Sequence, residues 1–146
     1  MAVKQMAGHL IRRLHQASTQ VFATRMQHEG FDLTPVQFAA LDAIRSAPGS
    51  DQAAIAAKIA YDRATIGGVI DRLEKKGLVV RTVSDRDKRA RAVTLSDAGD
   101  SLFARLQPVV ADLQNDILHG LDSTEKAQFL MLATKALAGI DLEKKG

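Results

Sequence analysis

Apolar residues recur every three or four positions through most of the chain, and this spacing predicts a mainly helical protein. The first apolar stripe consists of Leu10, Leu14, Ala17 and Val21. It predicts a long first helix, from about Met6 to about Gly30, with this stripe facing the core. A second stripe on the same helix mixes apolar with polar side chains and consists of Ile11, His15, Ser18 and Phe22.

Helix start and stop signals mark the next three helices. Their capping candidates are Thr34, Asp51 and Asp62. They predict helices over about 35–46, 51–60 and 63–76. Pro35 and Gln37 support the first of these, because proline suits the first helical position and Gln37 can complete a capping box. Gly77 suits the left-handed residue that ends the third.

The apolar period changes from 3.6 towards 2 after Gly77. This change predicts two short strands, over about 78–83 and 92–95. The residues between them are mostly charged and predict a hairpin, which would form a wing beside the preceding helix.

Helical spacing returns after the hairpin. Ser96 begins a pattern that continues to about Ile117, with Pro108 as a candidate kink, and a last helix is predicted over about 123–140. The expected fold is therefore mainly α with a small β-wing. We expect a winged helix-turn-helix with six helices and a two- or three-stranded antiparallel hairpin.

The composition indicates one ordered domain, since the 146 residues are 46% apolar and 25% charged. The chain has no cysteine, which excludes disulfides, thiolate metal ligands and thiol-based redox sensing. Lys4, Arg12 and Arg13 interrupt the N-terminal residues, so neither a signal peptide nor a membrane span is expected. We therefore expect a single cytoplasmic domain over 1–146 that does not bind membranes.

Positive charge is concentrated in one segment. Residues 58–91 carry ten basic and five acidic side chains, a net charge of +5, whereas the whole chain carries +3. Taken alone, this concentration of charge favours a solvated surface of mixed charge. The order of the elements favours double-stranded DNA, because two short helices, a glycine stop and a basic hairpin are typical of a winged helix-turn-helix. The helix over 63–76 would lie in the major groove and the hairpin in the minor groove.

The same region resembles the MarR family of bacterial winged-helix regulators. The resemblance rests on Leu33-Thr34-Pro35-Val36-Gln37-Phe38, on Ile70-Asp71-Arg72-Leu73-Glu74-Lys75-Lys76-Gly77-Leu78-Val79, on Asp87-Lys88-Arg89, on Val93-Thr94-Leu95-Ser96 and on Gly99. It implies a regulator that dimerises through its first, fifth and sixth helices and inserts the arginine of the Asp-x-Arg element into the minor groove. It also implies that an aromatic or phenolic effector weakens DNA binding.

The apolar faces of the first and last two helices independently need a partner surface to cover them. We therefore expect a winged helix-turn-helix lobe over 33–95 and a helical dimerisation lobe over 1–30 and 97–142. Together they describe a homodimer with two DNA-reading lobes.

The expected DNA contacts lie in three predicted elements: Thr34, Arg63, Thr65, Gly67, Gly68, Arg72, Lys75, Arg86, Lys88, Arg89 and Arg91. Asp87 is expected to orient Arg89, and the alternative is a solvated hairpin acid that contributes little. Asp71 is expected to orient a neighbouring arginine rather than to touch DNA. Gly67 and Gly68 each cost about 1 kcal/mol inside a helix. Their presence is explained either by close helix packing or by close approach of the backbone to DNA.

A ligand site is predicted beside the first helix. His15 and Ser18 interrupt apolar neighbours at helical spacing, and with Phe22 and Phe38 they would form a small amphipathic pocket. The alternative is that His15 and Ser18 lie in the dimer interface. The segment 8–13 is similar to that of a subset of MarR-like regulators linked to aromatic-acid degradation, which implies an aromatic effector. A regulator of drug efflux or stress response is the alternative.

No catalytic or metal-binding pattern is recognisable in the sequence. The four histidines stand at no i,i+4 spacing, and the chain has no glycine-rich phosphate loop and no nucleophile elbow. We therefore expect no enzyme, no metal and no cofactor. The expected function is a sequence-specific DNA-binding repressor, released from a pseudo-palindromic operator by a small aromatic or phenolic effector. The alternative is a winged helix that binds proteins instead of DNA.

Overall fold

The computed structural model describes residues 2–59, 62–83 and 91–145. Its helices are α1 (Ala7–Glu29), α2 (Pro35–Ser46), α3 (Gln52–Lys58), α4 (Arg63–Lys75), α5 (Asp97–Ile117) and α6 (Ser123–Lys145), and a short 3-10 helix, η1 (Val3–Gln5), precedes α1. The strands β1 (Val79–Val83) and β2 (Arg91–Leu95) pair antiparallel. The described residues thus confirm the predicted fold of six α-helices and a hairpin, and only the last helix is clearly longer than predicted.

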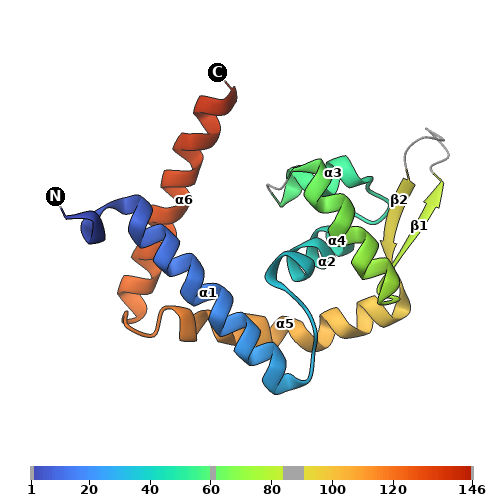
Figure 1. Cartoon of the computed structure of the whole chain (residues 1–146), viewed down its shortest axis with the longest axis horizontal. Helices are drawn as coiled ribbons and strands as arrows, with labels where there is room; N and C mark the ends of the chain where they lie inside the picture. The colour runs from blue at the N-terminus through green and yellow to red at the C-terminus, as the bar shows by residue number, and fades with distance from the viewer. Residues whose placement is uncertain (1, 60–61, 84–90, 146) are drawn as a thin grey trace.

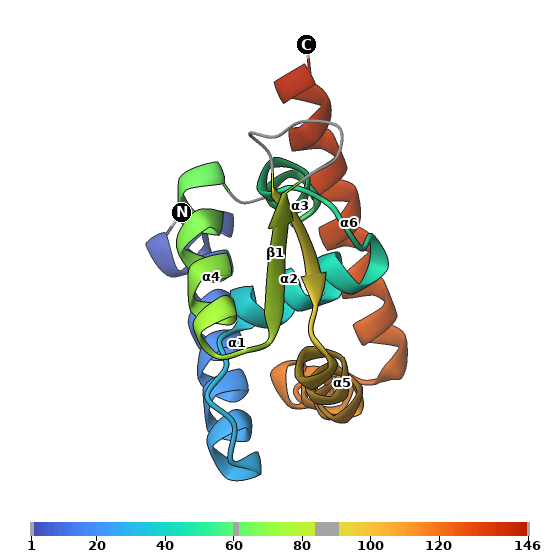
Figure 2. The ribbon, with the colours of Figure 1, turned by 90° about the vertical axis from the view of Figure 1, so that its right-hand side faces the viewer.

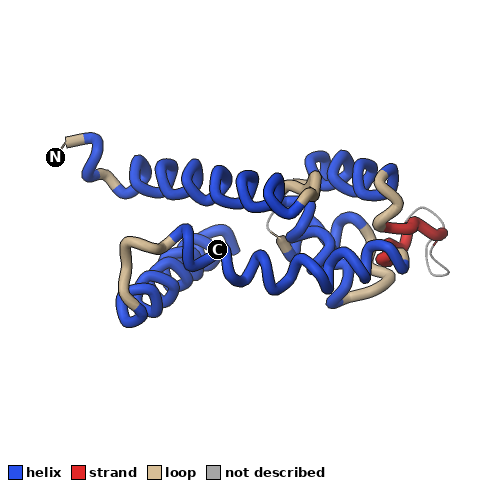
Figure 3. The backbone as a smooth tube through the Cα atoms, turned by 90° about the horizontal axis from the view of Figure 1, so that it is seen from below, coloured by secondary structure: helices blue, strands red, loops and turns tan. Residues whose placement is uncertain are grey.

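The elements separate into two ends joined by one long helix. α2, α3, α4 and the hairpin gather at one end, α1 and α6 occupy the other, and α5 runs along the base between them (Figure 1). α1 lies beside α5, whereas α6 turns away from both (Figures 1 and 3). None of the described helices is apolar over enough of its length to cross a membrane.

Local hydrogen bonds explain where the helices begin and end. The hydroxyl of Thr34 accepts a hydrogen bond from the backbone N–H of Gln37, and the Gln37 side chain accepts one from the N–H of Thr34, both at 3.2 Å. Asp51 and Asp62 cap α3 and α4 by accepting hydrogen bonds from the backbone N–H groups of Ala54 and Thr65. Gly77 adopts a φ of 76° just after α4, a conformation that favours glycine. The predicted caps are therefore confirmed.

Two contacts outside the β1–β2 pairing fix the hairpin: a bridge from β2 to Ser50, and a close approach of Leu78, the residue before β1, to α5. Val93 of β2 makes an isolated antiparallel bridge to Ser50. Ser50 thus adds a one-residue third strand beside β2. At Gly99, near the start of α5, an added Cβ would lie 2.1 Å from the carbonyl oxygen of Leu78. This contact requires glycine, because real Cβ atoms do not approach backbone oxygen so closely.

The hydrophobic core lies between the helix-turn-helix, the hairpin and α5. Its most deeply buried side chains are Met26, Leu41, Ile44, Ile55, Ile66, Ile70, Leu73, Val93, Phe103, Leu106 and Leu113. These residues come from α1, α2, α3, α4, β2 and α5. One continuous core therefore supports both α4 and the hairpin.

The prediction that Leu10 and Leu14 face the core is wrong for the single chain. Leu10 is 47% exposed and Leu14 is 39% exposed, whereas Phe22 and Met26 are the buried residues of α1. The reason is the position of α1, because burial is confined to its C-terminal half, where it packs against α2 and α5.

Candidate nucleic-acid interface

α4 turns one face to the core and the other outward. Its buried side chains are Ile66, Val69, Ile70 and Leu73, which recur at helical spacing. Its exposed residues include Ala64, Thr65, Gly68, Asp71, Arg72 and Lys75, which helical spacing places on the opposite side. Thr65, Gly68, Arg72 and Lys75, all predicted DNA contacts, therefore share one outward face of α4, the helix that lies beside the hairpin in Figure 2.

Asp62 holds the N-terminus of α4. Its carboxylate accepts a hydrogen bond from the backbone N–H of Thr65 at 3.3 Å. Hydrogen bonds from the side chain and backbone of Thr65 lower the pKa of Asp62 below its ordinary value of 3.8. The cap is therefore ionised at neutral pH, and the Thr65 hydroxyl takes part in it. Arg63 is the first residue of the helix, but its side chain lies outside the described part of the structure.

The two glycines of α4 are not required by packing within the chain. A Cβ at Gly68 would meet nothing within 4 Å in the described structure, and one at Gly67 would make an ordinary contact of 3.5 Å with Gln52. Close helix packing, one of the two interpretations of these residues, is therefore not supported. Close approach of the backbone to DNA stays a prediction for both.

The C-terminus of α4 is tied to the N-terminus of α2. The Lys76 ammonium lies 3.3 Å from the Gln37 side-chain oxygen and 3.7 Å from the Asp32 carboxylate, and it also donates to the Asp32 carbonyl. Thr34 caps α2 beside this contact, and its hydroxyl already accepts a hydrogen bond. The predicted contact between Thr34 and DNA stays a prediction.

The tip of the predicted wing is not among the described residues. Arg86, Asp87, Lys88 and Arg89 fall in the segment 84–90, so the minor-groove contact and the bracing of Arg89 by Asp87 remain predictions. The strands on either side are described. Arg91 begins β2, is exposed and pairs in register with Val83.

Arg81 also belongs to this interface and is not among the residues expected to contact DNA. It lies on β1 opposite the buried Val93 and forms an ion pair with Asp71 of α4. Asp71 thus pairs with an arginine of the strand, and its role in orienting an arginine for DNA binding stays a prediction. The signal in the sequence is the alternation of β1, which places Arg81 on the same strand face as Val79 and Val83.

Aromatic rings connect α1 with the helix-turn-helix. The ring centroids of Phe22 and Phe38 are 6.5 Å apart, and Phe38 stacks on Phe103 of α5 at 5.2 Å. The guanidinium of Arg45 lies 5.0 Å from the centre of the Phe103 ring. Arg25 further fixes α1 to α5 by ion pairs with two aspartates of α5. The structure therefore brings Phe22 and Phe38 together, as the predicted ligand site requires.

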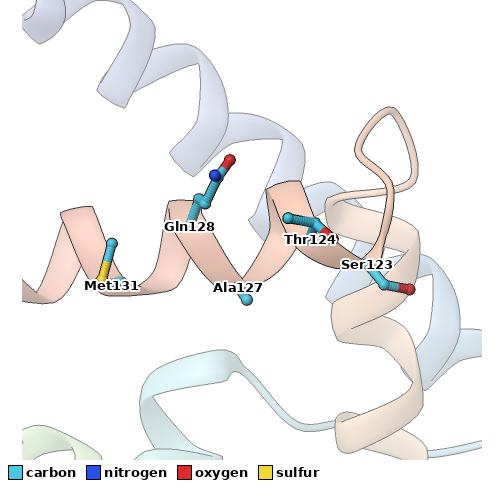
Figure 4. Close-up of a pocket in the computed structure, with 5 residues that line it drawn as sticks. All are labelled: Ser123, Thr124, Ala127, Gln128 and Met131. Atoms are coloured by element: carbon cyan, nitrogen blue, oxygen red, sulfur yellow. The ribbon is translucent and has the colours of Figure 1, made fainter.

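The other two predicted ligand residues are more open. His15 is exposed and lines a surface hollow of about 560 Å³ with Gln16, Thr19, Gln20 and Ala23, while Ser18 is half-buried. A second hollow, of about 450 Å³, follows α6 and is lined by Ser123, Thr124, Ala127, Gln128 and Met131 (Figure 4). All five of these side chains belong to one helix. Whether His15 and Ser18 bind a ligand remains a prediction.

The terminal helices expose many large apolar side chains. In η1 and α1 these include Val3, Leu10, Ile11 and Leu14, and in α6 Leu130, Met131, Leu132, Leu137, Ile140 and Leu142.

Within the described residues, no group of three or more histidine, cysteine or acidic side chains is arranged to hold a metal ion.

Comparisons with known proteins agree with this arrangement. A family model described as "MarR family" matches residues 31–90. The transcriptional regulator HosA of Escherichia coli O111:H- is 34% identical over 137 residues, which cover 94% of this chain and 98% of HosA. The structure of Bordetella bronchiseptica BpsR, titled for the regulation of its DNA binding by 6-hydroxynicotinic acid, matches with a TM-score of 0.86, 27% identity and coverage of 93% and 96%. The transcriptional repressor CouR, bound to a 23-mer DNA duplex, matches with a TM-score of 0.80, 28% identity and coverage of 93% and 94%.

Proposed function

Because this chain belongs to the MarR family of transcriptional regulators, we propose that it is a homodimeric DNA-binding repressor that a small aromatic acid releases from its operator. The observation that carries the proposal is the outward face of α4, where Arg72 and Lys75 are exposed beside the hairpin on one continuous core. CouR, a repressor solved with DNA, supports the repressor function.

In this proposal α4 enters the major groove. Thr65, Arg72 and Lys75 contact bases or phosphates, and Gly68 lets the helix backbone approach the DNA closely. The remaining contacts are Thr34, Arg63, Gly67, Arg86, Lys88, Arg89 and Arg91. Arg89, oriented by Asp87, reads the narrow minor groove, where negative potential attracts arginine. The two α4 helices of a dimer occupy half-sites about one helical turn apart.

The homodimer forms through the terminal helices. An apolar surface as extended as that of α1 and α6 marks an interaction site. A second copy satisfies this need, because a twofold axis brings the same surface of each copy together. Residues 33–95 then form the reading lobe, and residues 1–30 and 97–142 form the dimerisation lobe.

The effector is proposed to be a small aromatic carboxylic acid. The regulation of BpsR by 6-hydroxynicotinic acid supports this class. The Phe22 ring lies tilted beside Phe38, and Phe38 stacks on Phe103, so these rings connect α1 through α2 to α5. A ligand beside Phe22, held by His15 and Ser18, would shift α2 and thereby α4. By linkage, a ligand that prefers the shifted dimer must bind the DNA-bound dimer less tightly.

DNA binding is tested on an operator selected from a random duplex library. We expect the affinity to fall by about 10³-fold or more between 50 and 200 mM salt, as phosphate contacts require. Arg89→Ala should weaken operator binding by about 1–3 kcal/mol. Lys4→Ala, a cation removed far from the segment 58–91, is the control and should change it little. A flat salt response, or no selected duplex, would contradict the proposal and favour a winged helix that binds proteins.

The effector class is tested by calorimetric titration of aromatic acids, including 6-hydroxynicotinic acid, with and without operator. We expect at least one acid to bind the free dimer several-fold more tightly than the DNA-bound dimer. His15→Ala should weaken that binding while leaving operator affinity without ligand unchanged. Equal affinity for both states across the panel would contradict an aromatic acid as the effector and favour a regulator of drug efflux or stress response.

A further inference from the structure

The arginine of β1 occupies a position where a strand normally places an apolar residue. Arg81 pairs in register with Val93, which is fully buried, and its own side chain is only 10% exposed. Val79, two residues earlier on the same face of β1, is also buried. A guanidinium has therefore been placed on the core-facing side of the hairpin, beside α4.

Arg81 has one charged partner in the described structure. Its Nη2 donates to a carboxylate oxygen of Asp71, which is 58% exposed on α4. The Nε of Arg81 is buried without a hydrogen-bond acceptor among the described residues. The pair joins the middle of α4 to the middle of β1, ten residues further along the chain.

Stability does not explain this arrangement. Burying a guanidinium carries a large desolvation cost, and an ion pair with one half-exposed carboxylate offsets only part of that cost. An apolar side chain of similar volume at position 81 would fill the same space without that cost. Asp71 also brings a negative charge to the outward face of α4, three residues after Gly68 and four before Lys75. Both members of the pair are therefore unfavourable choices for folding or for DNA binding taken alone.

We propose that Asp71 and Arg81 are positioning residues that fix the angle between α4 and the β1–β2 hairpin, so that both elements meet adjacent grooves of one DNA duplex. A buried, directional ion pair defines an orientation better than apolar contacts, which tolerate sliding. The inference rests on the proposed function, because it concerns how the two reading elements are held relative to each other.

Variants of Asp71 and Arg81 should change stability and DNA specificity in different ways. Arg81→Met keeps the volume and removes the buried charge, so the melting temperature should stay the same or rise. Asp71→Ala leaves the guanidinium buried without its carboxylate, so the melting temperature should fall. The double variant should regain the melting temperature of the parent protein, because no unpaired charge is left.

The specificity for the operator should not follow the melting temperature across these variants. We expect Arg81→Met and the double variant each to lower the ratio of operator affinity to random-duplex affinity by about tenfold. Arg81→Lys, which can still reach Asp71, should recover most of the ratio. Arg91→Met is the matched control, because it removes an exposed cation from the same hairpin. It should weaken binding to both duplexes alike and lower the salt dependence.

The measurements are fluorescence anisotropy on the selected operator and on a random duplex, with thermal melts of each variant. An unchanged affinity ratio in Arg81→Met would overturn the positioning role, as would a loss of specificity that follows the melting temperature across the variants. If the parent protein selects no operator, the proposed function fails instead, and the melting temperatures still report whether the pair is costly.

Discussion

The two ends of the molecule solve the burial of apolar side chains in different ways. α2, α3, α4 and the hairpin form the reading end, which buries Ile66, Ile70, Leu73 and Val93 completely within one chain. The terminal helices leave comparable residues in contact with solvent, and Leu137 of α6 is 60% exposed. One chain therefore suffices to form the core beneath α4 and the hairpin. The apolar side chains of α6 and of the first half of α1 need another surface to cover them.

α6 differs even from α1 in its pattern. Its exposed apolar residues include three consecutive ones, Leu130, Met131 and Leu132, which point in three directions around a helix. A helix that is apolar on all sides is normally enclosed rather than laid on a single surface. We therefore expect α6 to pack against more than one helix of the proposed dimer.

The largest effect is expected at the contact between the hairpin and α5. Gly99→Ala forces a Cβ against the backbone of Leu78, so we expect a loss of about 3 kcal/mol in the free energy of unfolding. Chemical denaturation measures it. Gly68→Ala, on the outward face of α4, is the control, because its Cβ would meet nothing within 4 Å in the described structure. Equal effects of the two substitutions would contradict the close contact between Gly99 and Leu78.

The next effect concerns the exposed face of α6. Leu137→Asn should weaken dimerisation by about 2 kcal/mol, the value of burying one leucine side chain. Sedimentation equilibrium measures the dissociation constant. Val80→Asn replaces an apolar residue of β1 that is also exposed, and it should leave the dissociation constant unchanged. A monomeric parent protein, or equal responses of the two variants, would contradict the assignment of α6 to the dimer interface.

A smaller effect with opposite signs is expected at the outward face of α4. Gly68→Ala should stabilise the fold by about 1 kcal/mol, because alanine favours helices and its Cβ meets nothing. It should also weaken operator binding if the backbone of α4 approaches the DNA there. Thermal melts and anisotropy titrations measure the two changes. Unchanged operator affinity would show that the DNA does not need a glycine at this position.

The smallest effect is a pH dependence at the start of α4. The pKa of Asp62 is lowered in the folded chain by hydrogen bonds from Thr65. Its contribution to stability should therefore be complete above about pH 3.8 and be lost as the pH falls through the lowered value. NMR titration of the carboxyl carbon measures this pKa, and Asp62→Asn should remove the pH dependence while keeping a cap. A pKa at or above 3.8 would contradict the capping contact.

Local features allowed much of the reading end to be predicted. The capping box of Thr34 and Gln37, the cap by Asp62 and the glycine after α4 each involve residues within a few positions of one another. Such features depend on helix geometry and backbone hydrogen bonding alone. The same periodicity placed Leu10 and Leu14 towards a core, yet periodicity identifies an apolar face without identifying what covers it.

Local sequence is enough to place the helix starts, the apolar face of each helix and the basic segment, because these follow from interactions within a few residues. The tertiary structure alone decided that α1 is buried at Phe22 and Met26, that Gly99 meets the backbone of Leu78, and that Arg81 pairs with Asp71. Each of these depends on how separate elements come together. No local pattern encodes that arrangement, since it results from packing of the whole chain.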